Sequence, residues 1–309
     1  MAACGSTPFP EPVTPKGDIT LPKDTVIPSI DLLTVDPRAG RLYVAHTSMA
    51  AMDVIDVHAA KVIGSVKGLL GIKGIALSHD PNIVYTSESS GNVSVVDVPS
   101  LTVKQQISVG GSPDAIDYDP VHDLVAVAQS SDKQVAFIDG KTQKIVGKVP
   151  LPGDPALTTV DPSTGNIYLG INDKDAVVVI DPVALAIIKT FKGCNIQKPS
   201  GVTFDADRRQ LFVAGSAQLS IIDVLLDRCL GAVDIGHGTD QIAFNAHTHH
   251  VYTADGGSRY MSVIDAVTLK PLGVIGTGRR AATLAVDPTT DLIYVAAKPA
   301  GIIGVYHDP

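Results

Sequence analysis

The stretch DPRAGRLYV, residues 36–44, returns as DPSTGNIYL at residues 161–169 and as DPTTDLIYV at residues 287–295. Weaker copies of its Tyr-containing end lie between them, at Ile83-Val84-Tyr85, Val125-Ala126-Val127, Leu211-Phe212-Val213 and Val251-Tyr252-Thr253. A second marker is an apolar run closed by Asp, and its spacings are 41 to 43 residues: Asp56, Asp97, Asp139, Asp181, Asp223, Asp265 and Asp308. The chain is therefore a sevenfold repeat with a period near 42 residues.

Each repeat predicts four short β-strands. An apolar run, an Asp-Pro turn, the Tyr strand, a polar loop, the Val-Ile-Asp strand, a turn and a fourth apolar segment follow one another. Helical repeats of similar period need amphipathic spacing of 3.6 residues, which is absent here. Four-stranded units of roughly 40 to 50 residues are typical of propeller blades. We therefore expect an all-β fold, a seven-bladed β-propeller.

The two ends of the chain predict how the ring closes. The seventh repeat stops after its third strand, at Gly304-Val305-Tyr306, and a strand-like piece, Gly17 to Leu21, precedes the first repeat. We expect this N-terminal strand to complete the last blade, which leaves no long unpaired edge. Residues 1–16 hold four prolines and are predicted to form a tether, and residues 17–309 are predicted to form a single propeller domain.

The Leu-Tyr-Val strand with its Asp-Pro turn resembles the YVTN family of seven-bladed propellers, which are related in general style to NHL-repeat, lactonase-like and quinoprotein propellers. The resemblance covers Ile30 to Asp308. It implies that ligands bind at the mouth of the central channel, among the loops between blades and the loops between second and third strands. Such families include DNA-associated periplasmic proteins, surface-layer components, redox partner subunits, hydrolases and lyases, so the fold alone does not give the function.

Composition narrows the classes of partner. Hydrophobic residues make up 45% of the chain and charged residues 18%, which excludes a disordered chain. The net charge of −8 argues against nucleic acid and anionic membranes as partners. No apolar run approaches the roughly 18 to 20 residues that span a bilayer, so we expect no transmembrane segment.

The cysteines give information on the cellular compartment of the protein. Ala2-Ala3-Cys4-Gly5-Ser6 resembles the cleavage box of bacterial lipoproteins, so either a lipid anchor through Cys4 or a chance match is predicted. The first alternative implies a periplasmic or extracellular protein. Cys194 and Cys229 match no metal-binding spacing, and we expect them to be small buried apolar residues.

Candidate site residues are those that vary between repeats on the mouth face. One column begins the first strand of each blade: Asp31, Lys73, Asp114, Ala156, Ser200, Asp240 and Ala282. A second column follows the Tyr strand: His46, Glu88, Gln129, Ile171, Gly215, Asp255 and Ala297. Neighbouring loops add His237, Tyr260, Arg279 and Arg280. The polar members concentrate on blades six, seven, one and two, which predicts an off-centre site; the alternative is a solvated rim of charges.

Three kinds of chemistry fit these residues. Calcium or another divalent metal is one, held as in lactonase-like propellers by Glu88, Asp114, Asp240 and Asp255, although Asn ligands are scarce. Metal-free acid–base catalysis is the second, by His46 or His237 with Glu88 or Asp240. Apart from these, the tract Asn245 to His250 on the opposite face contains three histidines and resembles a metal-binding tract, of the kind that is more often adventitious.

Recognition without catalysis is the third chemistry and the one we favour. Its residues bind a small polar or anionic molecule or a protein partner: Asp31, Lys73, Asp114, Asp255, Tyr260, Arg279 and Arg280. No G-x-S-x-G, P-loop, H-E-x-x-H or G-x-G-x-x-G motif supports an enzyme, which in this fold is expected to be a hydrolase or lyase. We expect a monomeric extracytoplasmic binding protein.

Overall fold

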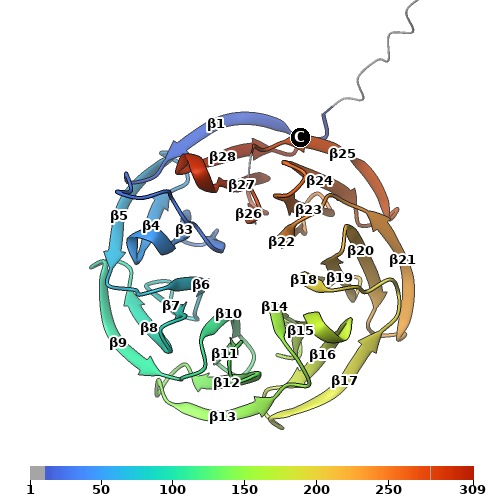
Figure 1. Cartoon of the computed structure of the whole chain (residues 1–309), viewed down its shortest axis with the longest axis horizontal. Coiled ribbons are helices and arrows are strands. Elements are labelled where there is room, and N and C mark those ends of the chain that lie inside the picture. The colour runs from blue at the N-terminus through green and yellow to red at the C-terminus, as the bar shows by residue number, and fades with distance from the viewer. Residues whose placement is uncertain (1–10, 279) are drawn as a thin grey trace, which may run out of the picture.

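The computed structural model describes residues 11–278 and 280–309. Seven four-stranded antiparallel sheets stand around a central axis, each with its first strand innermost and its last strand outermost (Figure 1). The prediction of a seven-bladed β-propeller is confirmed. Within the described residues, no helix has the length and the apolar character needed to cross a membrane.

The strands fall into four columns. The innermost strands are β2 (Leu33–Asp36), β6 (Ile72–Ala76), β10 (Pro113–Asp119), β14 (Pro155–Val160), β18 (Pro199–Asp205), β22 (Thr239–Asn245) and β26 (Leu284–Asp287). The second strands are β3 (Arg41–His46), β7 (Ile83–Glu88), β11 (Leu124–Gln129), β15 (Ile167–Ile171), β19 (Gln210–Gly215), β23 (His250–Asp255) and β27 (Leu292–Ala297).

The third strands are β4 (Ala51–Asp56), β8 (Asn92–Asp97), β12 (Gln134–Asp139), β16 (Ala176–Asp181), β20 (Gln218–Asp223), β24 (Tyr260–Asp265) and β28 (Ile302–His307). The outer strands are β5 (Lys61–Lys67), β9 (Thr102–Ser108), β13 (Ile145–Pro150), β17 (Ala186–Lys192), β21 (Arg228–Asp234), β25 (Lys270–Gly276) and β1 (Thr14–Thr20). Three short 3-10 turns lie between second and third strands: η1 (Thr47–Met49), η2 (Asn172–Lys174) and η3 (Lys298–Ala300).

The repeated aspartates close the turns, as the sequence suggests. Asp56 Oδ1 accepts the backbone N–H groups of His58 and Ala59, both at 2.9 Å, and Asp181 does the same for residues 183 and 184. Such Asx turns supply acceptors for turn N–H groups that no strand partner reaches. These carboxylates are therefore occupied by the scaffold.

The aromatic column of the second strands packs one blade against the next. Tyr43, Tyr85, Tyr252 and Tyr294 are at most 1% exposed. Tyr43 belongs to blade one but lies in an apolar cluster with Ile75 and Val84 of blade two. Every such cluster contains side chains of two neighbouring blades, so the burial of apolar side chains in one blade depends on the presence of the next.

The N-terminal strand closes the ring. β1 pairs antiparallel with β28 from Thr14 opposite His307 to Thr20 opposite Ile302, and it runs along the outside of the seventh blade (Figure 1). It begins three residues before the predicted Gly17, inside the segment expected to be a tether. Val13 and Ile19 are buried in clusters that join blade seven to blades six and one.

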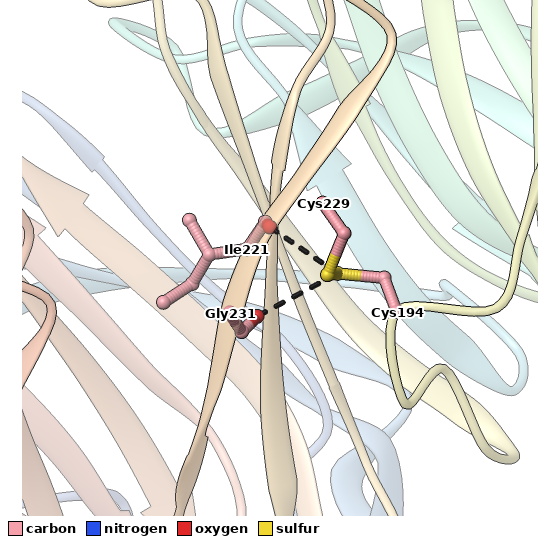
Figure 2. Close-up of a disulfide and its surroundings, with 4 residues drawn as sticks. All are labelled: Cys194, Ile221, Cys229 and Gly231. Atoms are coloured by element: carbon pink, nitrogen blue, oxygen red, sulfur yellow. Dashed lines mark hydrogen bonds between the residues drawn. A yellow bond between two sulfur atoms is a disulfide. The ribbon is translucent and has the colours of Figure 1, made fainter.

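One expectation about the cysteines is wrong. Cys194 and Cys229 form a disulfide with Cα atoms 5.3 Å apart, and Cys229 is exposed at the outer strand β21 (Figure 2). The bond fastens the loop between blades four and five to blade five. The backbone of this loop fills the space beside Gly215, where a Cβ atom would collide with the carbonyl oxygens of Gln197 and Lys198. Sequence spacing gave no sign of the pairing because a loop residue meets an outer-strand residue 35 positions later in the chain.

Removal of β1 should open the ring. A chain of residues 21–309 loses the burial of Val13 and Ile19, worth about 1.5 to 3 kcal/mol for each side chain, and exposes the edge of β28. We expect a lower Tm and concentration-dependent aggregation in differential scanning calorimetry and size-exclusion chromatography. Residues 11–309 serve as the matched control and should behave as the full chain. Equal Tm values for the two truncations would show that the ring closes without β1.

Candidate functional site

Five charged residues gather at the mouth of the channel. Asp31, Lys73, Asp114 and Asp240 stand at or beside the start of innermost strands, and Lys298 comes from η3. Lys73 Nζ lies 2.9 Å from Asp31 Oδ2. We call these five residues the mouth ring.

The pKa values in the mouth ring show that its members act on one another. Burial lowers the pKa of Lys73, but the charges of Asp31, Asp114 and Asp240 more than offset this and raise it. Burial and the charge of Asp31 raise the pKa of Asp114. Burial raises the pKa of Asp240 to about 6; Lys298 and Lys73 oppose the rise, and Asp31 and Asp114 add to it. Carboxylates that are shifted in this way in a cleft are typical of functional sites.

The column after the Tyr strand does not face the mouth, contrary to expectation. Its polar members lie inside their blades with exposures of 0%: His46, Glu88, Gln129 and Asp255. Gln129 Nε2 donates to the carbonyl oxygens of Val109 and Gly110, at 2.8 and 2.7 Å. The position is interior because the third strand and the loop between blades pack against the end of the second strand.

His46 is held between two carboxylates. Its Nδ1 lies 2.6 Å from Asp53 Oδ2 and its Nε2 lies 2.7 Å from Asp24 Oδ2, and Ser65 Oγ donates to Asp53 Oδ1 at 2.5 Å. Burial lowers the pKa of His46, but Asp53 and Asp24 outweigh burial and raise it. Both ring nitrogens are thus engaged, and His46 fastens the segment after β1 to blade one instead of pairing with Glu88.

Glu88 and Asp255 accept hydrogen bonds from hydroxyl groups of their own blades. Glu88 Oε1 accepts hydrogen bonds from Ser94 Oγ and from Thr86 Oγ1, and among the described residues its Oε2 has no partner. Asp255 accepts from Thr239 Oγ1 at 2.5 Å and Ser262 Oγ at 2.6 Å. Burial raises the pKa of both carboxyls, and these hydrogen bonds oppose it.

The predicted metal ligands are therefore divided between two environments. Asp114 and Asp240 belong to the mouth ring, whereas Glu88 and Asp255 lie inside blades two and six. In residues 11–278 and 280–309, no three His, Cys, Asp or Glu side chains lie close enough to hold a metal ion. The three histidines of the opposite face also separate, because His247 meets Asp291 at 2.8 Å and His250 meets Asp308 at 2.5 Å.

Three further predicted residues, His237, Tyr260 and Arg280, are exposed or half-buried near the ends of strands. His237 is exposed, and its backbone N–H donates to Ser258 Oγ at 2.8 Å. Tyr260 is half-buried at the start of β24, opposite Gly276, and Arg280 is exposed. Arg279 lies outside the described residues. Sequence reasoning missed Lys298, since alanine occupies the aligned mouth position just before it.

A cavity of about 530 Å³ continues the channel beyond the mouth ring. The first strands of all seven blades line this cavity. Among the described lining residues, Asp117 is the one with a carboxylate side chain. Asp117 was also missed, although it is the single charged member of a column that is otherwise Thr and Ala.

Two solved structures resemble this chain in fold. A chain of hydrazine synthase from Kuenenia stuttgartiensis matches with a TM-score of 0.81 at 16% identity, over 92% of this chain and 96% of that chain. A chain of a mitotic checkpoint complex matches with a TM-score of 0.81 at 14% identity, over 95% and 91%. No protein-family model and no curated protein sequence matches. The chain is a seven-bladed β-propeller, and its place in the YVTN family stays a prediction.

The mouth ring should reduce stability at neutral pH. The folded pKa of Asp240, about 6, exceeds the unfolded value of about 3.9, so the native state loses stability as the pH rises from about 4 through 6. Asp240→Asn removes the charge and should raise the free energy of unfolding by about 1 to 3 kcal/mol at pH 7.5. The gain should vanish below about pH 4.

Urea denaturation across this pH range measures the effect. Asp207→Asn, at an exposed turn on the opposite face, is the control and should change stability little at any pH. A gain for Asp240→Asn that is the same at pH 4 and pH 7.5 would contradict a buried, ionised Asp240.

Proposed function

We propose that this protein is an extracytoplasmic binding propeller that holds a small polar molecule, or a polar group of a protein partner, at the mouth ring. The observation that carries the proposal is the half-buried ion pair of Lys73 with Asp31, 2.9 Å apart, with Asp114 and Asp240 near enough for their charges to raise the pKa of Lys73. Preformed charges that are half-buried at the end of a channel lose less conformational freedom and less hydration on binding a ligand than fully exposed side chains do.

The charges of the ring favour a ligand with groups of both signs. Three carboxylates face two ammonium groups, so a ligand ammonium fits beside Asp114 or Asp240, and a carboxylate or phosphate fits Lys73 or Lys298. α-Amino acids and short peptides carry this pattern. The sequence predicts a small polar or anionic ligand, and the charges of the mouth ring add that this ligand also carries a positively charged group.

The competing enzyme hypothesis receives less support. A hydrolase or lyase of the lactonase-like type needs His46 and Glu88 to converge with Asp255 or Asp240 on one reacting atom. His46 instead engages Asp24 and Asp53, and Glu88 and Asp255 engage hydroxyls within separate blades. Recognition at the mouth is the better-supported function.

The disulfide supports the extracytoplasmic part of the proposal. Disulfides persist in the periplasm and outside cells and are rare in the reducing cytosol. Cys194–Cys229 closes a loop across 35 residues, and cross-links of this length stabilise by about 3 to 4 kcal/mol in the chain-entropy model. The possible lipid anchor, Cys4, lies outside the described residues.

Ligand binding at the mouth ring is tested with a panel of α-amino acids, dipeptides, dicarboxylates and sugar acids. We expect at least one compound with both charges to raise the Tm, and its affinity by titration calorimetry to fall roughly tenfold or more in Lys73→Met. Lys133→Met is the matched control, because Lys133 forms an exposed ion pair with Asp154 at 2.6 Å outside the ring. Ligands that bind Lys73→Met as well as they bind the native protein would exclude the mouth ring.

The location is tested by trapping thiols in intact cells. Acid quenching followed by alkylation should leave Cys194 and Cys229 unmodified until the protein is reduced, because an oxidising compartment keeps the pair bonded. Mass spectrometry of the tryptic peptides reads the result, and Cys194→Ser supplies a control in which Cys229 alkylates directly. Full alkylation of both cysteines at the time of quenching would contradict an extracytoplasmic location.

A further inference from the structure

The walls of the channel cavity are built from one strand position in all seven blades. The residues at this position pair directly with the second-strand column that contains the buried tyrosines, and all of them line the cavity: Thr34, Ala76, Asp117, Thr159, Thr203, Ala243 and Ala285. We call this set the channel ring. It is neutral except for Asp117.

Asp117 has a carboxylate that the scaffold does not use. Its Oδ1 accepts the N–H of the adjacent residue, Tyr118, at 3.0 Å, and among the described residues it forms no ion pair. Asp119 of the same strand, in contrast, closes a turn, where it accepts hydrogen bonds from Val121 and His122. Asp117 is half-buried in the cavity wall, and a carboxylate partly withdrawn from water without a counter-ion costs stability, so its presence in a cavity points to a ligand.

The other charged groups of the cavity do not neutralise Asp117. Arg38 lines the end of the cavity farthest from the mouth ring, but its guanidinium forms a bidentate pair with Asp36 at 3.0 and 3.1 Å. His79 and Tyr118 are the further titratable groups in the lining. Burial raises the pKa of Asp117 to about 7, and only the Tyr118 N–H opposes it.

The size and lining of the cavity indicate an organic ligand. About 530 Å³ lies within the range of small-molecule sites, roughly 300 to 1,000 Å³. Leu33, Leu77 and Phe244 provide apolar surface, and Thr159 and Thr203 provide hydroxyls. A calcium ion prefers about six to eight oxygen ligands, whereas the channel ring offers one carboxylate.

We propose that the channel cavity binds a small organic ammonium ion, with Asp117 as its counter-ion and the channel ring around it. The site is distinct from the mouth ring, whose residues are absent from the cavity lining. The Asp117 carboxylate makes a charge-assisted hydrogen bond to the ammonium group, and the apolar lining packs against the body of the ligand. Threonine hydroxyls accept the remaining ammonium protons.

The test uses two probes of equal size, benzylammonium chloride and neutral benzyl alcohol. Titration calorimetry at about pH 8, where Asp117 is ionised, should show that benzylammonium binds roughly tenfold or more tightly than benzyl alcohol. Asp117→Asn should abolish this preference. The variant is expected to fold, because it removes a charge that burial disfavours. Near pH 6 the preference should shrink in the native protein and stay absent in Asp117→Asn, which separates Asp117 from His79.

Two controls locate the site. Lys73→Met alters only the mouth ring, and Lys133→Met alters only the exposed ion pair with Asp154, so both variants should retain the preference for the cation. A preference that survives Asp117→Asn, or the failure of benzylammonium to bind the native protein, would overturn the channel site. Loss of the preference in Lys73→Met but not in Asp117→Asn would support the mouth ring and refute the channel site, so the two proposals fail separately.

Discussion

The packing of the second-strand aromatic column of each blade against the next blade is the contact on which this structure depends. Tyr294 of blade seven lies in one cluster with Leu33 and Leu42 of blade one, so the last interface exists only when the ring closes. β1 makes that closure through backbone pairing with β28 and through Ile19. A propeller gains its full apolar burial from seven interfaces, and the loss of one exposes two blade faces.

Closure also explains the buried charges near the N-terminus. The segment after β1 must cross from blade seven to blade one, and Asp24 of this segment meets His46 of blade one at 2.7 Å. Asp53 lies on the other side of the imidazole and accepts from Ser65. An imidazole between carboxylates also occurs in catalytic sites. Here, however, both ring nitrogens of His46 are hydrogen-bonded, and the His46 side chain is fully buried. Buried ion pairs of this kind specify one arrangement of the chain more than they add stability.

The two proposed sites differ in how the scaffold treats their charges. The mouth ring pairs Lys73 with Asp31 and leaves Asp114 and Asp240 with raised pKa values. The channel ring leaves Asp117 without a counter-ion. Elsewhere buried carboxylates join ion pairs, as where Arg209 of blade five meets Asp161 of blade four at 2.9 Å, or accept hydrogen bonds from hydroxyl groups, as Asp255 does. The carboxylates of the two proposed sites have fewer such partners, and the lower stability that results is the usual cost of a binding site.

The sequence by itself determined the ring: the 42-residue period, the Asp turns, the Tyr column and the N-terminal closing strand all follow from local pattern, because strand periodicity and turn chemistry are local properties. It also placed Asp31, Lys73, Asp114 and Asp240 in one column. Only the tertiary structure decided which polar residues face water. His46, Glu88 and Asp255 share a column that a neighbouring strand and loop cover, and Cys194 meets Cys229 across 35 residues. Burial and pairing of this kind depend on contacts between strands and loops that are distant in the sequence, and the pattern of a single repeat does not specify these contacts.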